Sequence, residues 1–142
     1  MKVYISGPIT GTDDYMERFE RVAWEVWVNY DCTVINPAEI NSHLPNDTTH
    51  AVYMRTSIAM LSMCDTIYLM KGWENSKGCK IEYNYARKNG IKIIYEEGAY
   101  QPKKEVDVES MTKRLDKMVH FHNMMGEYVR LKDVVEMLKE EL

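Results

Sequence analysis

The chain has 142 residues, of which 45% are hydrophobic and 28% are charged, and its formal net charge is −4. This length suggests one domain with a sizeable core, and the composition is that of a globular protein rather than a disordered one. Proteins that bind polymeric nucleic acid usually carry a basic stripe, because phosphate contacts dominate that affinity, and none is visible here. We expect no polymeric nucleic acid partner, but a small anion remains compatible, since one helix terminus can bind one phosphate.

The three cysteines, Cys32, Cys64 and Cys79, each lie in or beside an apolar segment. We interpret them as buried, reduced thiols of a cytoplasmic protein. No CxxC motif or Cys/His cluster with metal-ligand spacing occurs, so no metal or other cofactor is expected. The amino end begins directly with a strand pattern, and no apolar run approaches the about 20 residues that span a bilayer. We therefore expect neither a signal peptide nor a membrane partner.

Four short runs rich in β-branched and aromatic residues are typical of strands; they are residues 2–5, 32–35, 66–70 and 91–95. Apolar residues that recur at spacings of three and four predict amphipathic helices between them, over residues 15–30, 51–63 and 78–89. In the last helix, Ile81 and Tyr85 are expected on the apolar side. Strand alternating with helix predicts an α/β fold with an open parallel sheet, flavodoxin-like or Rossmann-like, and helices on both faces.

The character of the chain changes after residue 98. A short linker with proline and lysines is followed by two amphipathic patterns, over residues 108–125 and 131–142. We therefore expect an α/β domain over residues 1–98 and a helical extension over residues 99–142. The apolar stripe of the last helix is too narrow to stand alone, so the extension should dock on its own domain or on a second subunit.

Trp24 and Trp27 lie partly off the apolar stripe of the first helix. Exposed tryptophans often mark contact surfaces. This position favours a homo-oligomer.

In an open parallel sheet, ligands bind outside the carboxyl ends of the strands. This rule selects three loops, formed by residues 6–11, 36–39 and 71–78. In the third loop, Ser76 and Gly78 lead straight into a helix, in which Glu82 lies about one turn further. A hydroxyl and free backbone N–H groups at a helix start can hold a phosphate, and a nearby carboxylate can attack an electrophilic carbon or stabilise a cation. The alternative is that Ser76 only caps the helix and Glu82 is a solvated surface residue.

The first loop contains the sequence Gly7-Pro8-Ile9-Thr10-Gly11. It could cradle an anion, or it could be only a tight exit from the strand. It is neither a GxGxxG fingerprint nor a Walker sequence, so a dinucleotide or triphosphate site is disfavoured.

Four stretches resemble the nucleoside 2-deoxyribosyltransferase-like superfamily, in particular its small phage and bacterial members. They are VYISGPITG (3–11), NPA (36–38), CDTIYL (64–69) and GWENSKGCKIE (72–82), and together they cover roughly residues 1–95. The resemblance implies cleavage or transfer at the N-glycosidic bond of a nucleoside or nucleotide. A glutamate at the position of Glu82 attacks the anomeric carbon, and water or a second base resolves the glycosyl-enzyme intermediate. A tyrosine at the position of Tyr4 reaches that glutamate in the family, although strand alternation could instead bury Tyr4 in the core.

Serine at position 76 and glycine at position 78 favour one branch of this superfamily. Its nucleoside transferases tend to carry an acidic residue six positions before the nucleophile, suited to a free 5′-hydroxyl, whereas its nucleoside 5′-monophosphate hydrolases tend to carry serine there. A carboxylate would repel phosphate, and a hydroxyl can donate to it. We therefore expect a 5′-monophosphate ligand, with Trp73 either stacked on the base or filling the edge of the core. The expected substrate contacts are Gly7, Ile9, Gly11, Asn36, Pro37, Trp73, Ser76 and Gly78.

The chain departs from the family at one position. The family commonly places an aspartate eight or nine residues before the Cys-Asp pair of the third strand, and counting back from Asp65 leads to Ser57 and Thr56. If that aspartate is the proton donor, a loop residue must replace it; the candidates are Asp13, Asp14 and Asp47, of which Asp47 is taken as catalytic. Because general acid–base help is typically worth about 10²–10⁴-fold, its loss would favour a nucleotide-binding protein that sequesters or senses its ligand. An oligomeric interaction protein is a third, weaker reading.

Overall fold

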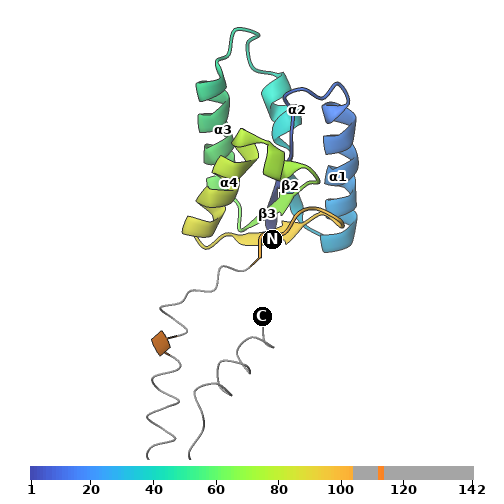
Figure 1. Cartoon of the computed structure of the whole chain (residues 1–142). Coiled ribbons are helices and arrows are strands. Elements are labelled where there is room, and N and C mark those ends of the chain that lie inside the picture. Colours follow the sequence, from blue (N-terminus) through green and yellow to red (C-terminus); the bar gives the residue numbers. More distant parts are fainter. Residues whose placement is uncertain (104–111, 114–142) are drawn as a thin grey trace, which may run out of the picture. The chain divides into compact units, whose positions relative to one another are not determined.

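The computed structural model describes residues 1–103 and 112–113, and the first compact unit is Met1–Gln101. This unit ends close to the boundary expected at residue 98, and nearly all of the expected extension 99–142 lies outside the described residues. Its elements follow in the order β1 (Lys2–Ser6), α1 (Tyr15–Tyr30), β2 (Thr33–Ile35), α2 (Pro37–Ser42), α3 (His50–Ser62), β3 (Thr66–Leu69), the 3-10 helix η1 (Trp73–Asn75), α4 (Lys77–Lys88) and β4 (Lys92–Tyr95) (Figure 1). No helix among the described residues is long and apolar enough to cross a membrane.

The four strands form one parallel sheet in the order β2-β1-β3-β4. This confirms the predicted α/β fold with an open parallel sheet, and the predicted strands and helices agree with the observed ones to within one residue at each end. The periodicity analysis does not predict α2 and η1, because both are too short to show a period. The start of α2 nevertheless has a local signal, since Asn36 caps it and Pro37 is its first residue.

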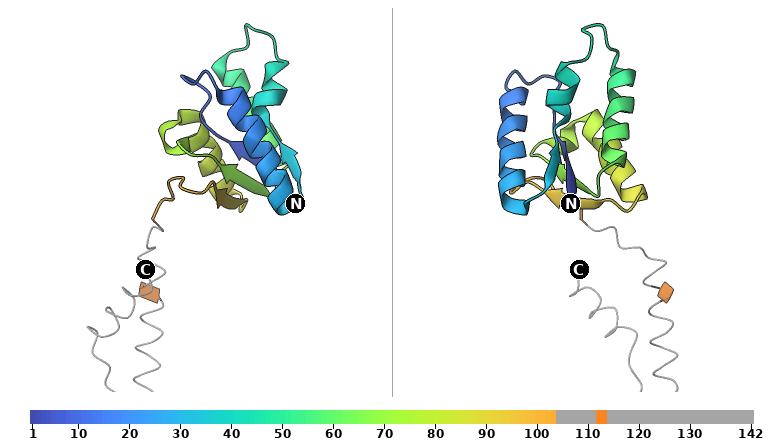
Figure 2. Two further views of the ribbon diagram at one scale, coloured as in Figure 1. Left: turned by 90° about the vertical axis from the view of Figure 1, so that its right-hand side faces the viewer. Right: turned by 180° about the vertical axis from the view of Figure 1, so that it is seen from behind.

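Helices cover both faces of the sheet, as the alternation of side chains along the strands requires. On one face, Val3 and Ile5 of β1 pack with α1; the buried residues of α1 in this cluster are Phe19, Val22 and Val26. On the other face, Tyr4 lies in a second cluster with residues of α3 and α4; these are Met60, Leu61, Cys79 and Ala86. The views from the side and from behind show α1 on one side of the sheet and α3 and α4 on the other (Figure 2).

The buried face of α4 differs from the predicted one. Ile81, expected on the apolar side, is 47% exposed, and the helix instead buries Cys79, Glu82 and Ala86. The prediction for Ile81 is therefore wrong. The prediction fails because it takes the apolar side of the helix to be the buried side. In the structure, α4 is instead rotated so that the Glu82 carboxylate faces the hydroxyl groups of Tyr4 and Ser6 on the sheet.

Candidate active site

The sheet has one topological switch point, between β1 and β3. β2, which follows β1 in the sequence, lies on one side of β1, and β3 lies on the other side of β1. Ligands bind in the crevice at such a point, outside the carboxyl ends of the strands. Ser6 pairs with Leu69 at this edge, and the Met70 amide donates to the Ser6 carbonyl at 2.8 Å. The first and third loops therefore leave the sheet side by side.

Glu82 lies at this edge and is only 6% exposed. The Tyr4 hydroxyl donates to Oε1 of Glu82 at 2.7 Å, and the Ser6 hydroxyl donates to Oε2 at 2.5 Å. Tyr4 and Ser6 are two residues apart in β1, so both side chains leave the sheet on the same face. Glu82 is thus a buried carboxylate held at both oxygens, and the alternative of a solvated surface residue does not describe it.

A third hydroxyl, from Ser57 of α3, also reaches this cluster. Burial raises the pKa of Glu82 above its ordinary value, and hydrogen bonds from Ser6, Tyr4 and Ser57 oppose that rise. Burial, followed by the charge of Glu82, raises the pKa of Tyr4 well above 10.0. Tyr4 therefore stays protonated and acts as a donor, and it orients the carboxylate rather than competing with it as a base.

Cys79 is the other reactive group near Glu82. Burial, together with the charge of Glu82, raises the pKa of the Cys79 thiol to about 11. A thiol that stays protonated is a poor nucleophile, because the thiolate is the reactive form. The Cys79 thiol is therefore a poor nucleophile at this site.

Ser76 is the N-cap of α4, and its Oγ accepts a hydrogen bond from the Cys79 amide at 3.3 Å. The capping oxygen uses a lone pair, so the hydroxyl proton remains available for a second partner. The amides of Lys77 and Gly78 begin the helix and have no acceptor within it. Capping and phosphate binding are thus compatible at Ser76. A Cβ at Gly78 would lie 3.3 Å from Sδ of Met54, so glycine there permits the close approach of α3.

In the first loop, Ile9 closes a turn by accepting from both the amide and the hydroxyl of Thr12, at 3.3 and 2.9 Å. Within residues 1–103, the amides of Ile9, Thr10 and Gly11 donate no main-chain hydrogen bond, so they are available to an anion. Gly11 has a φ of +81°, a conformation that favours glycine. A Cβ at Gly7 would lie only 2.5 Å from Sδ of Met70, so packing at the strand ends requires that glycine.

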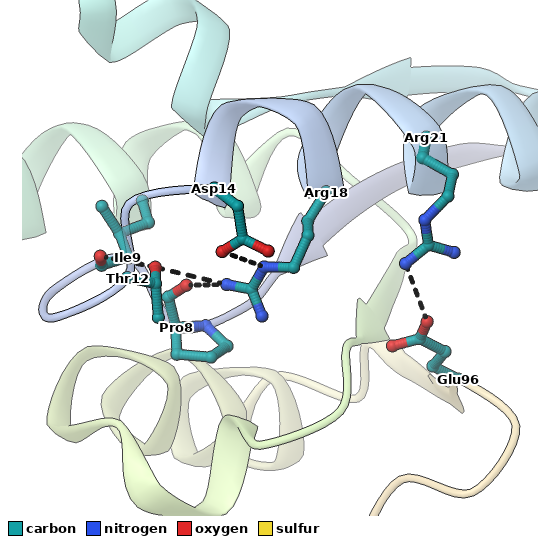
Figure 3. A network of polar contacts seen from close by, with 7 residues as sticks. All are labelled: Pro8, Ile9, Thr12, Asp14, Arg18, Arg21 and Glu96. Carbon is teal, nitrogen blue, oxygen red and sulfur yellow. Dashed lines mark hydrogen bonds and ion pairs between the residues drawn. The ribbon is translucent and has the colours of Figure 1, made fainter.

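Arg18, which lies in α1, forms contacts with this loop (Figure 3). Its Nη2 donates to the Pro8 carbonyl at 2.7 Å and lies 3.4 Å from Oγ1 of Thr12. Its Nε lies 3.4 Å from the Asp14 carboxylate. Asp14 is thereby committed to an ion pair at the start of α1.

Glu96, at the end of β4, supports the third loop. It is 8% exposed, and its Oε2 accepts the Lys71 amide at 2.7 Å. Its Oε1 lies 3.7 Å from Nη2 of Arg21, which provides the countercharge (Figure 3). The path of the chain after β3 is thus fixed from the neighbouring strand.

Trp73 does not face an open site. It is 3% exposed, its indole N–H donates to the Tyr100 carbonyl at 2.9 Å, and its ring centroid is 4.7 Å from that of Tyr83. This geometry corresponds to the second of the two alternatives, a residue that fills the edge of the core. In the second loop, Oδ1 of Asn36 accepts the Ala38 and Glu39 amides, so Asn36 and Pro37 form the start of α2 at the carboxyl end of β2.

The loop acids are not part of the Glu82 cluster. Asp13 and Asp47 are exposed, and Asp47 lies in the loop between α2 and α3, which protrudes at the carboxyl side of the sheet (Figure 1). Asp65 lies at the opposite edge, where it accepts the Lys2 amide at 3.0 Å and the Thr66 hydroxyl at 2.8 Å. These contacts give Asp65 a structural role at the amino end of the sheet.

Sequence reasoning did not select Ser6, Ser57, Arg18 or Glu96 as site residues. A signal existed for two of them. Ser6 shares a strand face with Tyr4, and Ser57 is a polar residue on an otherwise apolar helical stripe, at a position to which the count from Asp65 already leads. Arg18 and Glu96 act through contacts that the local sequence does not encode.

An open parallel sheet with a buried, hydroxyl-bound carboxylate at its switch point defines an α/β protein with a candidate acid site at the sheet edge. Over residues 1–95, the chain matches the family described as "Domain of unknown function (DUF4406)", and it belongs to that family. The match ends at the last residue of β4 and so includes the whole sheet and Glu82. A comparison with curated proteins finds no match.

Proposed function

We propose that this protein cleaves or transfers the N-glycosidic bond of a nucleoside 5′-monophosphate or nucleoside, with Glu82 as the nucleophile. The observation that carries the proposal is the buried Glu82 carboxylate, held by Tyr4 and Ser6 at the switch point of the sheet. Its position six residues after Ser76, in the helix that Ser76 caps, supports a ligand with an anionic end at the start of α4. The resemblance of residues 3–11 and 72–82 to deoxyribosyltransferase-like proteins supports the same reaction.

In the proposed reaction, a carboxylate oxygen of Glu82 forms a bond to C1′ of the sugar while the bond from C1′ to the base nitrogen breaks. The base leaves with the electron pair and takes a proton from an acid, for which Asp47 on the protruding loop is our candidate. The developing positive charge on the sugar is stabilised by the carboxylate. Water or a second base then attacks C1′ and releases Glu82. Hydrogen bonds from Tyr4 and Ser6 fix the carboxylate and reduce the reorganisation that attack requires.

The phosphate in this proposal is bound by the Ser76 hydroxyl and by amides of two loops. Ile9 and Gly11 supply N–H groups from the first loop, and Gly78 supplies one from α4. No metal takes part in the proposed mechanism. Trp73 is left out of base recognition, because its ring is buried against Tyr83.

The test is incubation with a panel of nucleosides and nucleoside 5′-monophosphates, followed by chromatography for free base. We expect base release by the native protein and a loss of at least about 10³-fold in Glu82→Gln, which keeps the size of the side chain but removes the nucleophile. Ser76→Asp should weaken the use of monophosphates much more than Ser76→Asn, although both residues cap a helix well. Release that persists in Glu82→Gln would falsify the proposed role of Glu82.

A second candidate function is nucleotide binding without turnover. The observation that favours it is Ser57, a neutral hydroxyl beside Glu82 where the resembling family suggests an acid. Tight binding of a 5′-monophosphate, unchanged in Glu82→Gln, lost in Ser76→Asp and never accompanied by base release, would select this function.

We also propose that two copies associate through the outer face of α1. Trp24 and Trp27 are 63% and 51% exposed, and their ring centroids are 5.2 Å apart, so they form one apolar surface. Light scattering of Trp24→Lys, with Asn84→Lys on the exposed side of α4 as the control, tests this. A native protein that is monomeric at micromolar concentration would contradict it.

A further inference from the structure

The guanidinium of Arg18 is directed at the first loop, and its side chain is 26% exposed (Figure 3). Its Nη2 faces the Pro8 carbonyl and the Thr12 hydroxyl, and its Nε faces the Asp14 carboxylate. The shortest of these contacts, 2.7 Å to the Pro8 oxygen, joins a charged donor to a main-chain acceptor. Hydrogen bonds from an ionised donor are shorter and stronger than neutral ones. Arg18 therefore holds protein oxygens through Nη2, and its Nε is paired with Asp14 by charge without a hydrogen bond.

The Pro8 carbonyl and the Ile9 N–H belong to the same peptide unit. A charged donor on the carbonyl polarises that unit and makes its N–H a stronger donor. Within the described part of the first loop, the Ile9 N–H makes no main-chain hydrogen bond. The opposite side of Ile9 is fixed as well, because its carbonyl accepts both the amide and the hydroxyl of Thr12.

We propose that Arg18 is a positioning residue that acts through the Pro8–Ile9 peptide, orienting and polarising the Ile9 N–H for the 5′-phosphate of the substrate. This inference rests on the proposed function and adds the source of its preference for a phosphate. Arg18 does not contact the phosphate; it makes the loop amide a better donor. The same contact ties the loop to α1.

The test compares kcat and KM of the native protein, Arg18→Gln, Arg18→Lys and Arg21→Gln for one nucleoside 5′-monophosphate and the matching nucleoside. Arg18→Gln should raise KM for the monophosphate about tenfold, because the Ile9 N–H, no longer oriented and polarised, loses its hydrogen bond to the charged phosphate. The nucleoside KM and both kcat values should change less than about twofold. Arg18→Lys, which keeps the charge but not the planar fork, should raise the monophosphate KM about threefold.

Arg21→Gln is the matched control, since it removes the same charge from the same helix. Arg21 contacts Glu25 and Glu96, and neither residue is in the first loop. Arg21 lies 3.7 Å from Oε1 of Glu96, whereas the Lys71 amide is held by Oε2, so the contact that supports the third loop does not pass through Arg21. If Arg18 acted only as bulk positive charge near the phosphate, Arg21→Gln should raise the monophosphate KM to a similar extent. We expect that KM to stay within about twofold of the native value.

A spectroscopic measurement on the same proteins is independent of turnover. In an NMR titration with deoxyribose 5-phosphate, the chemical shift of the Ile9 amide proton should move downfield in the native protein. The change in shift should be at least twofold smaller in Arg18→Lys, a variant that keeps the positive charge beside Asp14 and is therefore expected to fold. Three results would each overturn the inference: an equal rise in KM for nucleoside and monophosphate in Arg18→Gln, a rise in the monophosphate KM in Arg21→Gln as large as that in Arg18→Gln, or an Ile9 shift change in Arg18→Lys equal to the native one. If base is still released in these experiments, the proposed function stands. No release of base from any compound by the native protein overturns both.

Discussion

The hydroxyl of Tyr4 donates a 2.7 Å hydrogen bond to Oε1 of Glu82 across 78 positions of sequence. The contact joins the central strand of the sheet to α4, and it places a phenol that stays protonated against a carboxylate that must be ionised to act as a nucleophile.

Tyr4→Phe should shift the acid limb of the pH–rate profile upward by roughly one pH unit. The Tyr4 hydrogen bond lowers the pKa of Glu82 and so opposes the effect of burial; without it, a higher pH is needed to ionise the carboxylate. The measurement is kcat/KM between pH 4 and 9. Tyr68→Phe, on the opposite face of the sheet, is the control and should leave the limb in place. A downward shift in Tyr4→Phe would contradict the geometry.

Glu82 should make the native protein less stable as the pH rises. Its pKa is raised from 4.5 in the folded state, so the folded protein holds this proton more tightly than the unfolded chain. Its contribution is therefore present below about pH 4.5 and is lost as the pH rises through the folded pKa. Urea unfolding of the native protein and Glu82→Gln from pH 4 to 8 gives the difference in the free energy of unfolding. That difference should move in favour of Glu82→Gln with rising pH, and movement in the other direction would refute the raised pKa.

Gly7→Ala should destabilise the fold by about 1–3 kcal/mol, because the added methyl would overlap the Met70 side chain. Met70→Ala removes the sulfur that lies closest. The loss in free energy of unfolding of the double variant should therefore be smaller than the sum of the losses in the two single variants, by roughly 1 kcal/mol. Urea unfolding of the four proteins measures this coupling, and strict additivity would show that the two residues do not compete for space.

Asp47→Asn should lower kcat by about 10²–10⁴-fold if Asp47 supplies the proton to the leaving base. Asp13→Asn, an exposed acid on a different loop, is the matched control. The comparison needs a nucleotide whose base is uncharged before cleavage. Such a base would leave as an anion unless it is protonated, whereas a base that is already cationic needs no proton. Equal turnover in the native protein and Asp47→Asn would remove Asp47 from the mechanism.

The strands, the long helices and the edge that carries Glu82 are predictable from local patterns. Apolar periodicity determines where elements form, and the ligand rule for parallel sheets selects the loops. The rotation of α4 is not predictable in this way. Glu82 can be buried only because the hydroxyl groups of Tyr4 and Ser6 in β1 and of Ser57 in α3 form hydrogen bonds with it. The sequence near position 82 contains no information about these distant hydroxyl groups. The hydrophobic pattern alone therefore predicts Ile81, together with Tyr85, on the buried side of this helix.

The supporting contacts of the loops are non-local as well. Arg18 and Glu96 each act on a main-chain group of another segment, the Pro8 carbonyl and the Lys71 amide. Sequence patterns report side-chain chemistry and periodicity, and they carry no information about which main-chain groups a distant residue will bind.

The most direct test of the central claim is mass spectrometry of the protein quenched during turnover of a 2-fluoro-substituted nucleoside 5′-monophosphate, because the fluorine slows the release of a glycosyl-enzyme. The account predicts an added mass equal to the sugar phosphate on the peptide that contains Glu82, absent from Glu82→Gln. Base release without any adduct, or an adduct on another residue, would contradict it.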